Sequence, residues 1–197
     1  MWINFFVWRI VNGDGENVVI SAPTYLGTLW GIYTFSEKIL GVNPTFLWDD
    51  IALKTRDSLE ISPFEINEKP KGFGFRGVFI NDEDLLTGWK ISGGRREIDY
   101  PWYNDTVDVS IMDRVVETVL RLRLNLVIPA SFLDLDNPPE KPLADAVARR
   151  GIYLSQHHVE PVGLSTFTFE KYLEKYNKRG EFSYIKNPEL MEEMWLY

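Results

Sequence analysis

The sequence predicts an α/β fold: a small N-terminal α/β unit followed by the first part of a (β/α)8 TIM barrel that is incomplete in this chain. Apolar runs of strand length alternate with helical segments between residues 75 and 155, and this β-α-β-α-β order predicts a parallel sheet with right-handed crossovers. Polar residues follow the end of each run, which favours a barrel. No Gly-x-Gly-x-x-Gly follows a run, so a nucleotide-binding sheet has no support.

The predicted domains are a partial N-terminal α/β domain at 1–50, a linker at 51–74, and the first three β/α units of a truncated barrel at 75–197. A complete barrel needs about 250 residues. Only about 120 of the 197 residues follow residue 75. We therefore expect the chain to be an N-terminal fragment of a longer protein.

Composition excludes several classes of function. The net charge of −8 argues against non-specific binding to nucleic acid or to an anionic membrane. The absence of cysteine removes disulfides, thiolate metal sites and cysteine nucleophiles. The apolar start of the chain has no basic region before it and no cleavage site after it, and no segment approaches the length of about 20 apolar residues that spans a bilayer. We expect neither a nucleic-acid nor a membrane partner.

The N-terminal part predicts a hairpin and a helix. Strands at residues 2–11 and 18–22 flank a turn of Asn, Gly and Asp. Apolar residues at helical spacing predict a helix over 25–40, which Gly41 ends. The connecting region after it contains one predicted short strand at 59–61.

The continuous apolar run at residues 78–80 predicts a strand buried on both faces. It is followed at once by Asn81, Asp82 and Glu83. Ligands bind at the carboxyl ends of parallel strands in α/β folds, so these residues are candidates for a site. The alternative is an ordinary turn, because Asn and Asp also end strands.

The rest of the chain alternates between loops and regular elements. A long aromatic loop containing Trp102 is a candidate for substrate contacts. Predicted elements follow as a helix ending near 124, a strand at 125–130, a helix at 143–150, a strand at 152–155 and a helix at 190–196 that the Asn187 side chain caps. Asp134 and Asp136 lie in a proline-containing loop, which we interpret as a solvated turn.

The only two histidines, His157 and His158, follow the third predicted strand together with Glu160. Adjacent residues of a strand point to opposite sides, so this pattern does not converge on a metal ion. Two interpretations of the histidines remain: a structural role within the barrel, and recognition of the substrate. We favour substrate recognition. Asp82, Glu83 and Glu160 are acids expected at one face of the sheet, and glycoside hydrolysis uses two carboxyl groups flanking the bond. The positions permit such a pair without demonstrating one, and no metal or other cofactor is predicted.

Five blocks of the sequence resemble, in order and spacing, successive segments of glycoside hydrolase family 115. They are residues 27–41, 75–83, 122–130, 157–161 and 182–187. The resemblance covers nearly the whole chain and implies a xylan α-glucuronidase, which removes glucuronic acid or its 4-O-methyl ether from xylan by an inverting mechanism. It also implies an N-terminal α/β domain, a TIM barrel and further C-terminal domains.

The resemblance implies that Asn81 and Asp82 belong to the substrate pocket, with His157, His158 and Glu160 beside it. In the complete enzyme we expect Asp82 to be the catalytic residue. Glu83 and Trp102 are further candidates for substrate contacts. One departure is the second predicted strand, where the family is tryptophan-rich and this chain reads Val-Ile-Pro-Ala-Ser-Phe at 127–132. A further catalytic glutamate is expected from strands beyond this chain, so the fragment alone is expected to be inactive.

The implied partner is glucuronoxylan or a related acidic oligosaccharide, and a homodimer of the full-length protein is a further expectation. Relatives are typically periplasmic or secreted, although this chain does not fix its own location. The alternative from a different class is a non-catalytic carbohydrate-binding or structural module, in which the aromatic loop at 89–103 would be the sugar platform.

Overall fold

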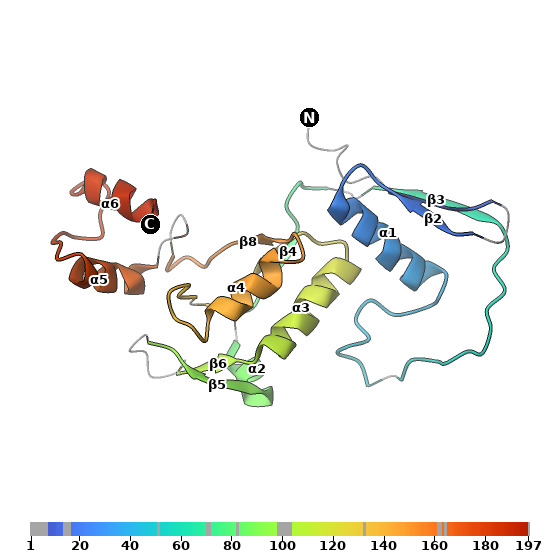
Figure 1. Ribbon diagram of the computed structural model, residues 1–197, viewed down its shortest axis with the longest axis horizontal. Coiled ribbons are helices and arrows are strands. Elements are labelled where there is room, and N and C mark those ends of the chain that lie inside the picture. Colours follow the sequence, from blue (N-terminus) through green and yellow to red (C-terminus); the bar gives the residue numbers. More distant parts are fainter. Residues whose placement is uncertain are drawn as a thin grey trace. The chain divides into compact units, whose positions relative to one another are not determined.

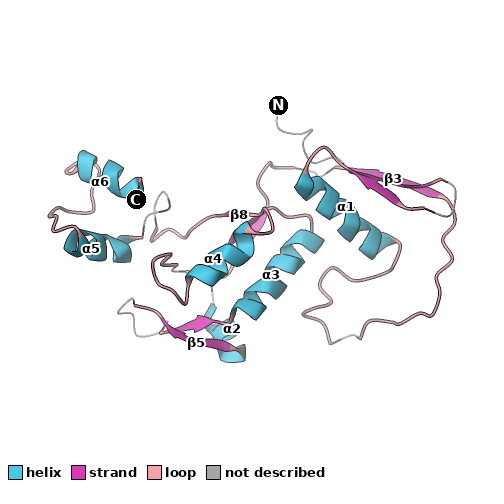
Figure 2. Cartoon of the chain, viewed as in Figure 1, coloured by secondary structure: helices cyan, strands magenta, loops and turns pink. Residues whose placement is uncertain are grey.

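The computed structural model describes residues 8–13, 17–50, 52–69, 72–81, 83–97, 104–131, 133–160, 163 and 165–196 (Figures 1 and 2). The chain forms two compact units, one of Met1–Gly77 with Arg114–Leu126 and one of Val78–Asp113 with Val127–Tyr197. The domain ranges predicted from the sequence, 1–50, 51–74 and 75–197, remain predictions. No helix in the described part is both long and apolar enough to cross a membrane.

The first unit contains a three-stranded antiparallel sheet in the order β2-β1-β3, made of β1 (Trp8–Asn12), β2 (Val19–Ser21) and β3 (Phe64–Glu68). The pairing of β1 with β2 confirms the predicted hairpin. The short strand predicted at 59–61 is wrong, because the strand lies at β3. In β3, exposed and less exposed residues alternate, and Ile66 lies opposite Ile10 of β1.

Helix α1 (Tyr25–Lys38) confirms the predicted helix and lies along this sheet (Figure 1). Thr24 caps its first turn, since the backbone N–H of Gly27 donates to Thr24 Oγ1 at 3.1 Å. Trp30 is fully buried, and its ring meets that of Trp8 edge to face at a centroid distance of 5.8 Å. The two indoles therefore form the centre of the core between helix and sheet.

The remaining elements are β4 (Gly77–Phe79), α2 (Glu83–Trp89), β5 (Ile91–Arg95), β6 (Asp105–Val107), α3 (Val109–Arg121), β7 (Leu126–Ile128), α4 (Lys141–Ala148), β8 (Tyr153–Leu154), α5 (Thr166–Lys175) and α6 (Pro188–Trp195). Strands β4, β7 and β8 form one sheet in that order. The backbone N–H of Ile80 donates to Ile128 O at 2.9 Å. These strands are parallel, which confirms the predicted β-α-β-α-β arrangement. A parallel sheet of this kind begins both a barrel and a doubly wound fold, so the barrel stays a prediction.

The prediction that the strand at 78–80 is covered on both faces is wrong for this chain. Val78 and Phe79 are 36% and 37% exposed. The reason lies in the strand order, because β4 is at the edge of its sheet and, among the described residues, pairs with β7 alone. An apolar sequence alone does not distinguish an edge strand from a central one.

The segment predicted as one long loop after residue 83 contains regular structure. Helix α2 occupies its first part, and β5 pairs antiparallel with β6. Residues 98–103, including Trp102, lie outside the described residues. The double glycine at 93–94 is part of β5 rather than of a loop, and glycine within a strand weakens the sequence signal for that strand.

Helices α5 and α6 pack against each other in the second unit through Phe169, Tyr172, Met191 and Met194. Helix α5 was not predicted from the sequence, whereas α6 confirms the predicted C-terminal helix. The predicted cap by the Asn187 side chain is wrong. Its amide group instead donates to the backbone oxygen of Glu181 at 3.0 Å, which holds the loop before α6.

Candidate functional site

The carboxyl ends of β4, β7 and β8 bring several of the predicted site residues together. Asn81 follows β4 and is exposed. The hydroxyl of Ser131, in the loop after β7, donates to the backbone oxygen of Asn81 at 2.8 Å. The loops after two neighbouring strands are therefore joined by a direct hydrogen bond, as the parallel arrangement predicts.

The two histidines follow β8 and lie against each other. The ring centroids of His157 and His158 are 3.7 Å apart, and the ring of His157 lies 4.5 Å from that of Phe79 in β4. The expectation that adjacent histidines point to opposite sides applies to an extended strand, and its condition is not met here, because β8 ends at Leu154 and the histidines lie beyond it. Burial lowers the pKa of His157, and the neighbouring His158 lowers it further.

Glu160 is buried, with 2% of its surface exposed. One carboxylate oxygen accepts a hydrogen bond from the backbone N–H of Leu133 at 3.1 Å, and the other accepts one from the backbone N–H of His157 at 3.3 Å. Burial raises the pKa of Glu160 to about 7, although these two hydrogen bonds act in the opposite direction. The side chain thus connects the loop after β7 with the loop after β8.

A pocket lies at the end of β8 and contains three of the predicted site residues. Its lining is Leu154, Ser155, Gln156, His157, His158, Glu160 and Gly163. Asp82 and Trp102 lie outside the described residues. Glu83 begins α2, and its side chain is likewise outside the described part.

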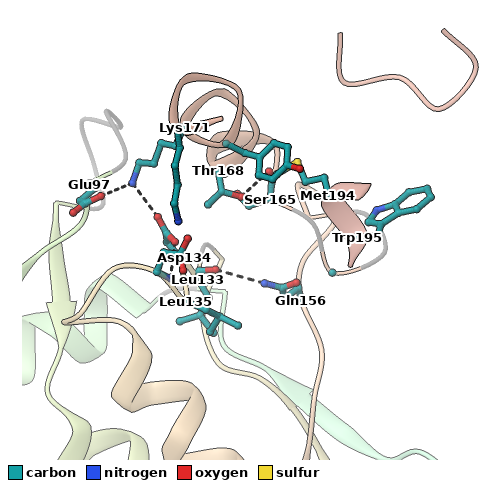
Figure 3. Close-up of a pocket in the computed structure, with 14 residues that line it drawn as sticks. Glu97, Leu133, Asp134, Leu135, Gln156, Ser165, Thr168, Lys171, Met194 and Trp195 are labelled. Atoms are coloured by element: carbon teal, nitrogen blue, oxygen red, sulfur yellow. Dashed lines mark hydrogen bonds and ion pairs between the residues drawn. The ribbon is translucent and has the colours of Figure 1, made fainter. Parts of the chain in front are cut away.

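A second, neighbouring pocket of about 250 Å³ is visible in Figure 3. Its lining comes from the loop after β7, from Gln156 and from α5 and α6. The Lys171 ammonium of α5 donates to Glu97 Oε2 at 2.6 Å and to Asp134 Oδ2 at 2.9 Å. Burial acts to lower the pKa of Lys171, but the hydrogen bonds to Glu97 and Asp134 outweigh it and raise the pKa.

The interpretation of Asp134 as part of a solvated turn is wrong, while Asp136 is exposed as expected. Asp134 is only 2% exposed, and its second oxygen accepts a hydrogen bond from the backbone N–H of Asp136 at 3.0 Å. The turn is present, but the carboxylate of Asp134 is buried and pairs with Lys171. Lys171 follows Asp134 by 37 positions in the sequence, so no local pattern could have indicated this pair.

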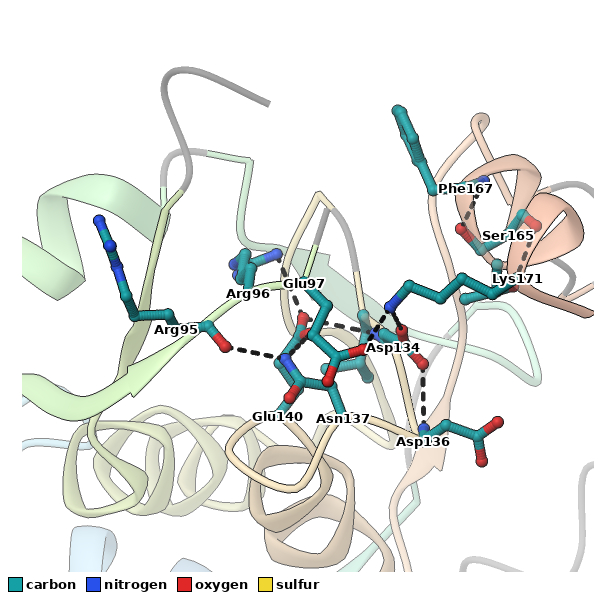
Figure 4. Close-up of polar contacts among 12 residues, drawn as sticks. Arg95, Arg96, Glu97, Asp134, Asp136, Asn137, Glu140, Ser165, Phe167 and Lys171 are labelled. Carbon is teal, nitrogen blue, oxygen red and sulfur yellow. Dashed lines mark hydrogen bonds and ion pairs between the residues drawn. The ribbon is translucent and has the colours of Figure 1, made fainter. Parts of the chain in front are cut away.

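A buried polar network supports the wall of this pocket (Figure 4). The guanidinium of Arg96 lies 3.4 Å from Glu140, and both side chains are fully buried. The Asn137 amide donates to Glu140 Oε2 at 2.7 Å and to the backbone oxygen of Arg95 at 3.0 Å. Burial raises the pKa of Glu140, against the lowering effect of Arg96. The network fastens β5 to the loop before α4.

No local pattern in the sequence indicated a role for Arg96, Glu140 or Lys171. One indirect signal for the first two was available, namely the double glycine before Arg96. A Cβ at Gly94 would lie 2.2 Å from Pro139 Cβ, so this strand approaches the loop before α4 more closely than another residue would allow. Among the described residues, no group of three or more His, Asp and Glu side chains is arranged to hold a metal ion.

Comparison with known proteins identifies the family. The sequence profile of glycosyl hydrolase family 115 matches residues 68–197. A solved structure of a family 115 4-O-methyl-α-glucuronidase with specificity for decorated arabinogalactans is similar with a TM-score of 0.72 and 25% sequence identity, over 96% of this chain and 24% of that chain. This chain thus spans about a quarter of the length of that protein. No curated protein matches. The profile match covers well over half of the sequence, and the chain belongs to glycosyl hydrolase family 115.

Proposed function

We propose that this chain is the N-terminal portion of a glycosidase that removes glucuronic acid or 4-O-methylglucuronic acid from xylan by an inverting mechanism. The observation that supports this most directly is the grouping of Asn81, His157 and Glu160 at the carboxyl edge of a parallel sheet in a family 115 chain. Polar side chains at this edge are placed where barrel enzymes bind their substrates. In this proposal the chain supplies the small N-terminal domain and the first three units of the barrel.

Asp82 is the proposed catalytic residue, because it comes directly after Asn81 in the sequence. Asn81, Glu83 and the two histidines bind the hydroxyl and carboxylate groups of the sugar, and Trp102 adds an aromatic contact. Glu160 holds the backbone of His157, as its hydrogen bond indicates. A second carboxyl group comes from a part of the enzyme outside this chain. In an inverting enzyme the two groups stand roughly 6.5–9.5 Å apart, which leaves room for a water molecule.

The test uses the protein encoded by the complete reading frame, assayed in parallel with the 197-residue chain. Aldouronic acids from glucuronoxylan and decorated arabinogalactan oligosaccharides are offered as substrates, since the similar enzyme carries specificity for decorated arabinogalactans. NMR of the released sugar reports whether the anomeric configuration is inverted. We expect release of the uronic acid by the complete protein and no release by the chain alone.

The variant Asp82→Asn separates catalysis from binding. The change is nearly isosteric, so we expect turnover to fall by at least about 10²-fold, the size of an acid–base contribution, with the thermal unfolding midpoint retained. Normal turnover in Asp82→Asn would remove this residue from the mechanism. Binding of oligosaccharides without release by the complete protein would instead support a non-catalytic carbohydrate-binding module. Light scattering of the complete protein tests the predicted homodimer.

A further inference from the structure

The pocket of about 250 Å³ beside α5 and α6 has no part in the proposed catalytic group. It adjoins the pocket that contains the histidines, because Gln156 and Gly163 line both. Its volume is below the roughly 300–1,000 Å³ typical of sites for drug-sized ligands, so it suits a single small ring. A ligand that extends from one pocket to the next would pass Gln156, because this residue lines both.

Aromatic and apolar side chains form one side of this pocket. Tyr172 and Met194 are buried, at 5% and 3% exposure, and contribute to its base. Trp195 is 38% exposed at the edge of the pocket. Its ring is stacked on that of Tyr184 with a centroid distance of 5.5 Å, which fixes its orientation. A fixed indole is a suitable surface for the apolar face of a sugar ring.

Polar groups that suit hydroxyl groups form the opposite side (Figure 3). An ammonium group has three donors, and Lys171 directs two of them to Glu97 and Asp134, so its third can reach a ligand oxygen. The Glu97 side chain is 58% exposed and offers carboxylate oxygens as acceptors. Thr168 and the Gln156 amide add further hydrogen-bonding groups to the lining.

The charges in the lining distinguish between kinds of sugar. Three carboxylates (Glu97, Asp134 and Asp136) face two ammonium groups (Lys171 and Lys175). The excess of negative charge disfavours a uronic acid, because the carboxylate of that sugar would meet like charges. The charge of Lys171 does not offset this repulsion, since Lys171 is already paired with Asp134. A neutral ring meets no such repulsion and can donate its hydroxyl hydrogens to the carboxylates.

We propose that this pocket is a subsite for one neutral sugar ring of the polysaccharide, next to the position of the uronic acid. The ring lies between the edge of the pocket at Trp195 and the side formed by Lys171 and Glu97, and it directs its hydroxyl groups to those two charged residues. This inference rests on the proposed function for the identity of the polysaccharide. The charges of the lining favour a neutral sugar, and xylose and galactose both meet this condition.

Calorimetric titration of the protein encoded by the complete reading frame tests the proposal. The probes are xylotetraose and β-1,3-galactotriose, which are neutral, and tetragalacturonic acid, which is anionic. We expect at least one neutral probe to bind, and Trp195→Ala to weaken that binding about tenfold, as loss of an aromatic contact of roughly 1.4 kcal/mol does. Tyr25→Ala, which removes an exposed aromatic ring from α1, is the matched control and should leave the affinity unchanged.

A second variant tests the role of charge without touching the core. Glu97→Gln removes one exposed negative charge, so the affinity for tetragalacturonic acid should rise relative to that for the neutral probe. The proposal is overturned if neither neutral probe binds, if Trp195→Ala binds as tightly as wild type, or if the anionic probe binds wild type as well as the neutral ones do. Asp82→Asn should retain the neutral-sugar affinity, so loss of uronic acid release and loss of this subsite are separate outcomes.

Discussion

The carboxylate of Glu160 accepts a hydrogen bond from the backbone N–H of Leu133 at 3.1 Å, although the two residues lie 27 positions apart in the sequence. Its other oxygen accepts from the backbone of His157. One buried acid therefore sets the relative positions of the loops after β7 and β8. These loops line the two pockets, so the protonation of Glu160 bears directly on the site.

The first prediction concerns pH. The pKa of Glu160 is about 7 in the folded chain, against 4.5 for an unperturbed glutamate. The folded state therefore holds the proton more tightly, and its contribution to stability is complete below pH 4.5 and is lost as the pH rises to about 7. At about 1.36 kcal/mol per pKa unit, the loss is at most roughly 3.5 kcal/mol. Glu160→Gln does not titrate, so its stability should decline less over this interval.

Urea unfolding of wild type and Glu160→Gln at several pH values from 4.5 to 7.5 measures this difference. Glu170→Gln, an exposed position in α5, serves as the control. Parallel stability profiles for wild type and Glu160→Gln would show that Glu160 titrates normally.

The second prediction concerns the buried ion pair of Arg96 and Glu140. Arg96→Met leaves the carboxylate of Glu140 buried without its cation, which should cost about 3–5 kcal/mol in the free energy of unfolding. The double variant Arg96→Met, Glu140→Leu removes both charges and should recover much of this loss. Denaturant unfolding of the single and double variants supplies the coupling energy. Additive effects in this double-mutant cycle would contradict a direct interaction.

The third prediction concerns Lys171. Lys171→Met deprives Asp134, which is only 2% exposed, of its ammonium partner, and should lower the free energy of unfolding by about 1–3 kcal/mol. Lys186→Met is the matched control, because Lys186 and Glu181 are 62% and 67% exposed. Such an exposed pair contributes about 0.5 kcal/mol or less. Equal losses in the two variants would mean that burial of Asp134 does not strengthen its ion pair.

The fourth prediction concerns the close approach of β5 to the loop before α4. Gly94→Ala places a methyl group 2.2 Å from Pro139 Cβ and should destabilise the chain by about 1–3 kcal/mol. Gly88→Ala in α2 meets no atom within 4 Å and should be stabilising by roughly 0.5–1 kcal/mol, since alanine suits a helix better. Thermal unfolding of both variants checks the opposite signs. A loss of stability in Gly88→Ala comparable to that in Gly94→Ala would show that space does not decide the effect.

Local patterns were sufficient for most of the regular elements. These patterns all depend on residues near one another in the sequence. They are the helical spacing of apolar residues in α1 and α3, the turn residues between β1 and β2, and the alternation of strands and helices that predicted the parallel sheet. Strands β3, β5 and β6 and helices α2 and α5 were missed. A strand at the edge of a small sheet is stabilised mainly by its pairing with β1, which is more than fifty positions away.

The family, the parallel sheet and the placement of Asn81 and the histidines after its strands could be predicted from the sequence, because these features depend on local residue order. The pairing of Lys171 with Asp134, the burial of Arg96 with Glu140, and the hydrogen bond from the Leu133 backbone to Glu160 became apparent only from the folded chain. A charged side chain is solvated by default, and only the packing of distant segments supplies the partners that make its burial favourable.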